Sequence, residues 1–153
     1  TDLEAHPEAR GQDLEATRKA CEKFRNIPTS VMNFVEGTRY TPEKHAAQAS
    51  PFAHLLKPRA GGVSFVMSAM NGMLDSLLDV TIAYRPEVVN FWEMCCGRME
   101  RISVRIRQRP VPEWAAGDYQ SDPEFRARFQ DWLNELWTVK DGDYAGLAEA
   151  AHG

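Results

Sequence analysis

The feature that most constrains the fold is a run of large apolar residues near the C-terminus that recurs at the spacing of an α-helix. The residues that share this face are Phe125, Phe129, Trp132, Leu133, Leu136 and Trp137. Ser121 and Glu124 are placed to form a capping box at the start of the helix. We therefore predict an amphipathic helix whose apolar face packs into the core. A second interpretation is that this face, with its two tryptophans, docks on a membrane interface or on another part of the protein.

Shorter patterns upstream alternate between strands and helices. Apolar residues on both sides predict buried strands at 30–35 and 77–84, and residues 102–107 alternate between Ile or Val and Ser or Arg, as in a half-exposed strand. The basic side of that strand would be solvated or would face anionic lipid head groups. Helices are predicted at residues 13–25, 42–48 and 61–73. This order indicates an α/β protein with a mixed β-sheet flanked by helices.

The composition limits the domain organisation and the partners. With 153 residues, 43% of them apolar, the chain has the size and content of one globular domain. We assign residues 13–141 to that domain and expect flexible segments at 1–12 and 142–153. A net charge of -4 argues against a nucleic-acid partner. No apolar run is long enough to span a bilayer, so these residues are expected to be soluble by themselves.

Cysteine and histidine spacing argues against a metal site. The three cysteines, two of them adjacent at Cys95 and Cys96, form neither a disulfide framework nor a metal-ligand pattern with histidine. The sequence also lacks a phosphate-binding Walker loop, a dinucleotide glycine fingerprint and a Gly-x-Ser-x-Gly elbow. We therefore predict no metal and no cofactor. The methionine-rich helix at 61–73 is expected to be buried, with a lipid-contacting surface as the alternative.

The run Glu36-Gly37-Thr38-Arg39 follows the predicted strand at 30–35. It combines a carboxylate, a conformationally free glycine, a hydroxyl and a guanidinium at the place where a strand ends. An arginine there can bind a phosphate or a carboxylate through two parallel hydrogen bonds, and a glycine lets a ligand approach the backbone. The residues alone also allow a plainer interpretation, a surface ion pair between Glu36 and Arg39 that contributes little to stability.

Three stretches carry a family resemblance. Residues 33–44 are Asn-Phe-Val-Glu-Gly-Thr-Arg-Tyr-Thr-Pro-Glu-Lys, residues 56–62 are Leu-Lys-Pro-Arg-Ala-Gly-Gly, and residues 78–84 are Leu-Asp-Val-Thr-Ile-Ala-Tyr. In this order they resemble the third block, the basic glycine-containing segment and the fourth block of the glycerolipid acyltransferases. The best-known members of that family are the 1-acylglycerol-3-phosphate (lysophosphatidic acid) acyltransferases. The resemblance covers about residues 30–110.

The resemblance implies a phosphate-binding site. Arg39 would bind the phosphate of the acyl acceptor, and Glu36 would hold Arg39 or a glycerol hydroxyl in place. Gly37 and Thr38 would shape the turn. Lys57 and Arg59 are secondary candidates, because they lie just ahead of the helix that Gly61 and Gly62 open.

The catalytic element of the family is absent from this chain. That element is a His followed, after four intervening residues, by an Asp. Here His6, His45 and His54 are followed at that distance by Gly11, Ser50 and Arg59, and His152 stands near the terminus. We therefore predict no catalytic residue and expect the chain to be the C-terminal part of a longer protein, with which a first residue of Thr rather than Met agrees. A homologue that has lost catalysis is the alternative.

The functional expectation is a substrate-binding fragment of an acyltransferase. The parent enzyme would move a fatty acyl group from acyl-CoA or acyl carrier protein to a lysophospholipid such as 1-acylglycerol-3-phosphate, in phospholipid biosynthesis or remodelling. It would associate with the cytoplasmic face of a membrane through the missing N-terminal segment. The isolated fragment would be inactive. The alternatives are a non-catalytic lipid- or phosphate-binding module, and an interaction domain that uses the face of Trp132 and Trp137.

Overall fold

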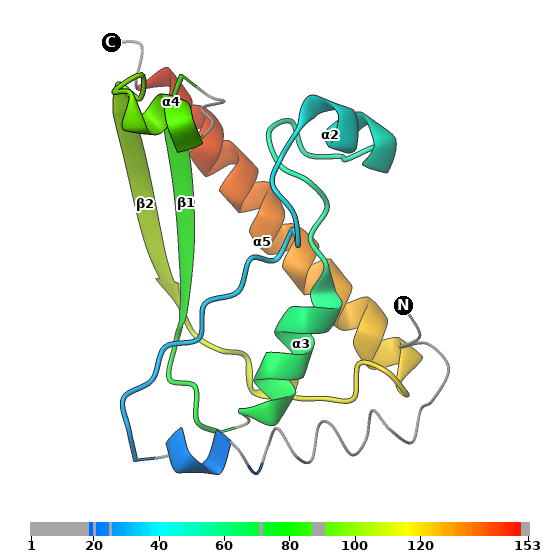
Figure 1. Cartoon of the computed structure of the whole chain (residues 1–153). Coiled ribbons are helices and arrows are strands. Elements are labelled where there is room, and N and C mark those ends of the chain that lie inside the picture. The colour runs from blue at the N-terminus through cyan, green and yellow to red at the C-terminus, as the bar shows by residue number, and fades with distance from the viewer. Residues whose placement is uncertain (1–18, 20, 25, 71, 87–90, 151–153) are drawn as a thin grey trace.

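The computed structural model describes residues 19, 21–24, 26–70, 72–86 and 91–150 (Figure 1). Its elements are, in order, η1 Glu22–Phe24, α2 Pro42–Gln48, α3 Ala60–Ala69, β1 Leu77–Arg85, α4 Phe91–Cys95, β2 Arg101–Arg109, η2 Glu113–Ala115 and α5 Pro123–Glu149, where η marks a short 3-10 helix. The long helix α5 crosses the molecule diagonally, with the two strands near its C-terminal end and α3 near its N-terminal half (Figure 1). The expected flexible segment at 1–12 and most of the predicted helix at 13–25 lie outside the described residues.

Helix α5 begins at a side-chain cap. The Asp122 carboxylate accepts hydrogen bonds from the backbone N–H groups of Glu124 and Phe125, at 2.9 and 3.0 Å. The cap is therefore one residue later than the predicted Ser121. The predicted domain end at 141 is also wrong, because α5 continues to Glu149 and buries Asp143. Small residues after Gly142 suggested a tail, but contacts with the sheet hold this part in the helix.

The core lies between α3, α5 and the loop that precedes α3. Its buried members are Phe52, Leu55, Ala60, Val63, Met67, Ala115, Phe129, Leu133 and Trp137. Phe129, at 0% exposure, makes edge-on contacts with Trp114, whose ring centroid is 6.3 Å away. The core interpretation of the apolar face of α5 is thus confirmed. The burial of Met67 and Met70 likewise confirms the core interpretation of α3, although that helix ends at Ala69 rather than near residue 73.

The loop between α2 and α3 is fixed to α5 by one carboxylate. Asp141 accepts hydrogen bonds from the backbone N–H groups of Ala53 and His54, both at 2.8 Å. The ring of His54 stacks on Tyr144, with the ring centroids 5.1 Å apart. Thr41 caps α2 as predicted, because its hydroxyl accepts from the N–H of Lys44 at 3.3 Å. These contacts set the path of the chain around the segment that the sequence singles out.

The predicted combination of helices and strands is confirmed, but the predicted mixed sheet is not: the described sheet consists of β1 and β2 paired antiparallel, with Val80 opposite Ile106 and Ile82 opposite Val104. Both strands were predicted, but the expectation that β1 is buried on both faces is wrong, because Leu78 and Val80 are 59% and 40% exposed. The predicted strand at 30–35 is wrong: these residues form no strand, and Met32 and Phe34 are 82% and 81% exposed. A strand needs a partner for its N–H and C=O groups, and an apolar pattern in one sequence does not identify that partner.

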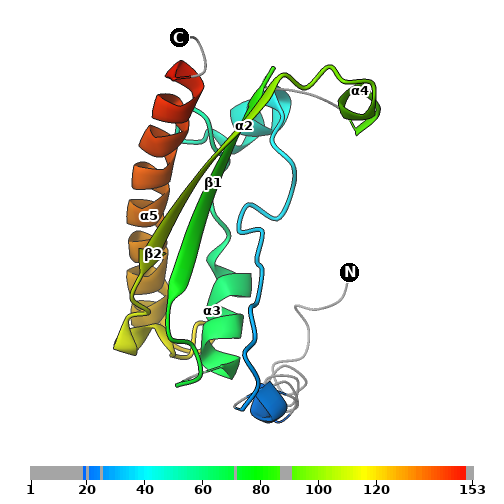
Figure 2. The ribbon, with the colours of Figure 1, turned by 90° about the vertical axis from the view of Figure 1, so that its left-hand side faces the viewer.

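The basic face of the sheet, which was expected to face solvent or lipid head groups, is the face that packs against the protein. The polar face packs against α5, where Arg105 and Arg107 bind the buried carboxylate of Asp143 and Lys140 binds Asp79 at 2.7 Å. The other face is apolar and exposed: Leu78, Val80, Ile82, Tyr84, Ile102, Val104 and Ile106. Helix α5 lies on one side of the strands, whereas α4 and the chain leading to α2 lie on the other (Figure 2). Alternation determines which residues share a face, but not which face is buried.

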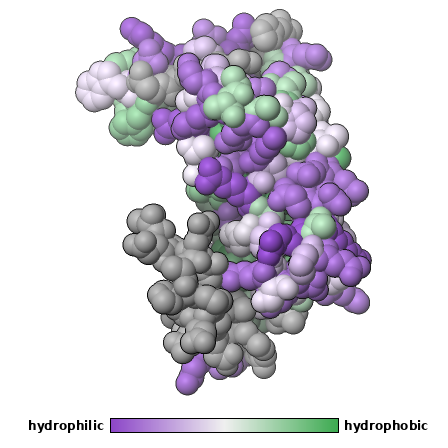
Figure 3. Space-filling model, turned by 90° about the vertical axis from the view of Figure 1, so that its right-hand side faces the viewer, coloured by the Kyte–Doolittle hydropathy of each residue, from purple (hydrophilic) through white to green (hydrophobic). Residues whose placement is uncertain are grey.

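The surface elsewhere is mainly polar. The side of the molecule that carries α2 shows mostly hydrophilic side chains among the described residues, with isolated hydrophobic ones between them (Figure 3). Within the described part of the chain, no helix combines the length and the apolar character that crossing a membrane requires.

Candidate functional site

The run that the sequence singled out forms a tight turn rather than the end of a strand. The backbone N–H of Gly37 donates to the carbonyl oxygen of Phe34 at 2.9 Å, which closes a β-turn. Gly37 has a φ of 69°, in the left-handed region that side chains disfavour. Glycine is therefore needed here for the turn itself, and the half-buried Thr38 and the exposed Arg39 follow it.

Arg59 lies against this turn. Its backbone N–H donates to the carbonyl oxygen of Val35 at 2.9 Å, and a Cβ atom placed on Gly37 would be only 3.3 Å from Arg59 Cδ. The sequence predicted that Arg59 and the turn contribute to one anion site, and the structure brings the two segments together. The absence of a side chain at Gly37 thus leaves room for the arginine as well as for the turn.

Arg39 projects from the turn with its guanidinium unpaired within the described part of the chain. Arg39 is exposed, and the only hydrogen bond it receives there is at its backbone oxygen, from Lys44 Nζ at 3.2 Å. Lys44 Nζ also donates to the Thr38 hydroxyl at 2.7 Å. The turn therefore carries three cationic side chains from separate segments: Arg39 after the turn, Lys44 in α2, and Arg59 before α3.

Glu36 turns away from these cations. Burial raises the pKa of the Glu36 carboxyl, and contacts with the Trp137 side chain, the Leu56 backbone N–H and the Lys140 charge oppose that rise. The Trp137 ring N–H is close enough to lower this pKa, but it forms no hydrogen bond of good geometry. No ion pair joins Glu36 to Arg39 among the described residues. The structure thus supports neither the surface ion pair nor a Glu36 that holds Arg39.

Lys57 is not part of this cluster as far as its contacts show. It is exposed, and its backbone N–H donates to the Gln48 side-chain oxygen at 3.0 Å. Sequence reasoning named Lys57 but missed Lys44, although Lys44 follows the Thr41 cap within the same run. The sequence did contain a signal for Lys44: the first turn of a helix that starts after Thr41 lies next to residues 38 and 39.

The described histidines have structural contacts. A ring nitrogen of His45 lies 2.6 Å from the carbonyl oxygen of Phe52, and the ring of His54 stacks on Tyr144. The first contact ties α2 to the loop that follows it, and the second ties that loop to α5. Neither arrangement supplies the His and Asp pair that a general base requires, and His6 and His152 lie outside the described residues.

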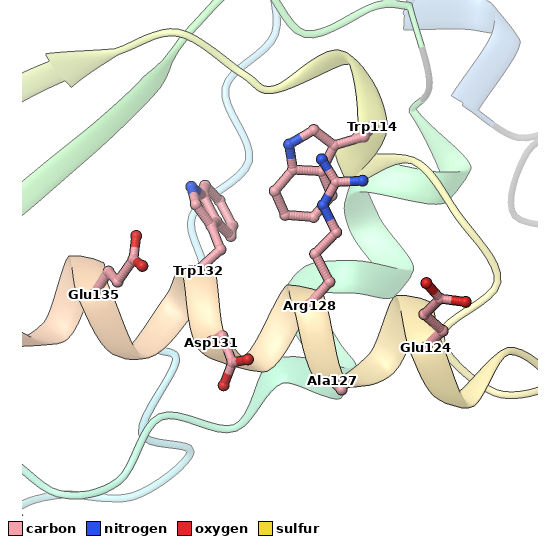
Figure 4. Close-up of a pocket in the computed structure, with 7 residues that line it drawn as sticks. All are labelled: Trp114, Glu124, Ala127, Arg128, Asp131, Trp132 and Glu135. Carbon is pink, nitrogen blue, oxygen red and sulfur yellow. The ribbon is translucent and has the colours of Figure 1, made fainter.

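An open depression of about 450 Å³ lies along the N-terminal half of α5, beside Trp114 (Figure 4). It is lined by Trp114, Glu124, Ala127, Arg128, Asp131, Trp132 and Glu135. The guanidinium of Arg128 covers the Trp114 ring, 4.2 Å from its centroid. None of the predicted site residues lines this depression, and its ionised groups are mainly carboxylates, which would repel an anionic substrate.

No family model matches this sequence, and no match was found among solved structures. The case for the site therefore depends on the residues and their geometry.

A first prediction separates Glu36 from the anion site. Glu36→Gln keeps the size and an acceptor oxygen beside Trp137 and Leu56 but removes a charge that burial disfavours. We expect unchanged or slightly higher stability, within about 1 kcal/mol, and unchanged affinity for a phosphate ligand. Denaturant unfolding and a binding titration on the same variant measure the two quantities. An affinity loss as large as that of Arg39→Ala would place Glu36 in the site instead.

Proposed function

We propose that this chain provides the acceptor-binding part of an acyltransferase of the glycerolipid type, and that its turn at residues 36–39 binds the phosphate of a lysophospholipid. The observation that carries the proposal is the group of three cationic side chains around a left-handed glycine: Arg39, Lys44 and Arg59. Within the described residues no carboxylate pairs with any of them. Unpaired guanidinium groups beside an open turn suit a phosphate ligand.

The chemical step would be a direct transfer. A general base would take the proton of the free acceptor hydroxyl, and the resulting oxygen nucleophile would attack the thioester carbonyl of acyl-CoA or acyl carrier protein. The carbon–sulfur bond would break and the thiolate would leave and take up a proton. The base, a His paired with an Asp, would belong to a part of the protein outside these residues. The contribution of this chain is to bind and orient the acceptor. We further propose that the parent works at the cytoplasmic face of a membrane.

The family resemblance supports this assignment over other phosphate ligands. The turn and Arg59 belong to two stretches that resemble neighbouring sequence blocks of the acyltransferases, and the structure places them in contact through Arg59 N–H and the Val35 carbonyl. Val35 and Arg59 are far apart in the sequence, so their contact comes from the fold and not from chain proximity.

A second prediction tests the proposed ligand. We expect the 153-residue chain to bind a short-chain lysophosphatidic acid saturably in isothermal titration, and to bind the matched monoacylglycerol, which lacks the phosphate, at least tenfold more weakly. Affinity should fall with added salt, because the cations are at the surface. Equal affinity for both lipids would contradict a phosphate-directed site.

A specific observation favours a second candidate function, an interaction domain. The exposed face of β1 and β2 presents Val80, Ile82, Val104 and Ile106 with no charged side chain among their cross-strand neighbours on that face. Of the earlier candidate face for such a role, Trp137 is buried in the core, whereas Trp132 packs against the core and also lines the open depression. A non-catalytic phosphate-binding module would share the turn and lack the base. Acyl transfer by a longer form of the protein, abolished when its His is replaced, would distinguish the enzyme from both.

A further inference from the structure

We propose that Lys44 both positions Arg39 and binds the phosphate: its ammonium holds the backbone that presents Arg39 and keeps one N–H for the ligand. The inference rests on the proposed function, because it concerns the same site. Lys44 is the first-turn lysine of α2 and makes contacts that neither Arg39 nor Arg59 makes.

The contacts of Lys44 reach back across the turn. Its ammonium donates to the Thr38 hydroxyl at 2.7 Å and to the Arg39 carbonyl oxygen at 3.2 Å, which are acceptors on two consecutive residues. An ammonium has three N–H donors, so two bind the protein and one is left for a ligand oxygen. The backbone of Lys44 is itself fixed, since its N–H donates to the Thr41 hydroxyl in the α2 cap. The lysine therefore links the turn to the helix.

The acidic neighbour of Lys44 does not neutralise it. Glu43 precedes Lys44 in α2, and the pKa of its carboxyl is lowered by a hydrogen bond from its own backbone N–H and then by one from the Thr41 hydroxyl. This carboxylate thus serves the start of α2. No ion pair of Lys44 occurs among the described residues. The positive charge of Lys44 is therefore available to a ligand beside Arg39.

The arrangement constrains the backbone that carries Arg39. Among the described residues the exposed Arg39 side chain has no hydrogen-bond or ion-pair partner to orient it, so its position depends on the backbone on either side. Gly37 sets the turn, and Lys44 holds the next two residues. Loss of the lysine would therefore weaken binding in two ways, through the missing charge and through a looser Arg39.

The test uses the 153-residue chain and sn-glycerol 3-phosphate as the probe. Lys44→Met removes both the donor and the charge, so it should raise the dissociation constant about tenfold in an NMR titration at fixed salt concentration. Lys44→Gln, which keeps a short donor without charge, should fall between wild type and Lys44→Met. The matched control Lys57→Met, another exposed lysine, should change the constant less than twofold. Melting temperatures should stay unchanged for all three, because both lysines are at the surface.

A double-mutant cycle with Thr38→Val separates positioning from charge. If Lys44 acts through the turn, Thr38→Val alone should weaken binding about threefold, and adding it to Lys44→Met should cause little further loss. Independent losses that multiply would overturn the positioning role. If wild type and Lys44→Met bind the probe with equal affinity, this inference is overturned, whereas the proposed phosphate site is not. Absence of binding by wild type would overturn the proposed function as well.

Discussion

If the chain belongs to the proposed acyltransferase, replacing Arg39 by lysine is expected to raise the activation free energy for the phosphate-bearing acceptor in that enzyme by about 1–3 kcal/mol. The substitution keeps the charge but removes the planar fork that can hold two phosphate oxygens. The fold should be spared, because the Arg39 side chain is exposed and forms no hydrogen bond or ion pair among the described residues. Kinetics with lysophosphatidic acid and a melting curve on the same variant measure both effects.

Controls make the Arg39 result specific. Lys57→Ala should reduce acceptor use much less, because Lys57 is not seen to contact the turn. A nearly silent Arg39→Lys would be the outcome expected of an ordinary surface charge. A loss of activity that is matched by a loss of stability would indicate a structural role. Either result would remove Arg39 from the site and leave the family resemblance without its main functional residue.

Replacing Asp143 by alanine is expected to lower the free energy of unfolding by about 2–4 kcal/mol. The carboxylate is 5% exposed and binds Arg105 at 2.8 Å and the Nη2 atom of Arg107 at 2.6 Å. Its removal would leave two arginines on the polar face of the sheet without their partner, although both are partly solvated. Urea unfolding measures the change. Asp131→Asn, at an exposed site on the same helix, is the matched control and should change stability by less than about 0.5 kcal/mol.

The same carboxylate gives stability a dependence on pH. Hydrogen bonds from Arg107 and then from Arg105 hold the pKa of Asp143 well below its usual range, against the opposing effect of burial. The folded state therefore binds a proton on this group less readily than the unfolded state. Its contribution is complete at neutral pH and is lost as the pH falls from about 5 through the folded pKa. Asp143→Asn should flatten this acid dependence, and a slope equal to that of wild type would show that other carboxylates cause it.

Helices α2 and α3, the first half of α5 and the two paired strands could be predicted because their signals are local, whereas α4 was not predicted. The apolar spacing from Phe125 to Trp137 determines a helix face, and the Thr41 hydroxyl and Pro42 determine the start of α2. The strand at 30–35 could not be predicted in the same way, since a strand depends on a neighbour that the local pattern does not name. The end of α5 was missed because Asp143 and Lys140 are held by charges on distant strands.

The site was predictable in part for a related reason. The chemistry of Arg39 and the conformation of Gly37 are properties of single residues, so the sequence indicates them directly. The inward direction of Glu36 depends on Trp137 and Leu56, which are remote in sequence, and it contradicted the expected pairing with Arg39. Lys44 was overlooked because its role arises from the distance between its ammonium and the Thr38 hydroxyl.

The most direct test of the central claim is an NMR titration that follows the arginine side-chain N–H signals while short-chain lysophosphatidic acid is added to the 153-residue chain. Guanidinium signals shift when they bind a phosphate. We predict saturable shifts for Arg39 and Arg59 with one shared dissociation constant, and none for Arg105 and Arg107, which bind Asp143. Shifts confined to arginines elsewhere, or equal small shifts at every exposed arginine, would contradict the assignment of the turn at residues 36–39 as the phosphate site.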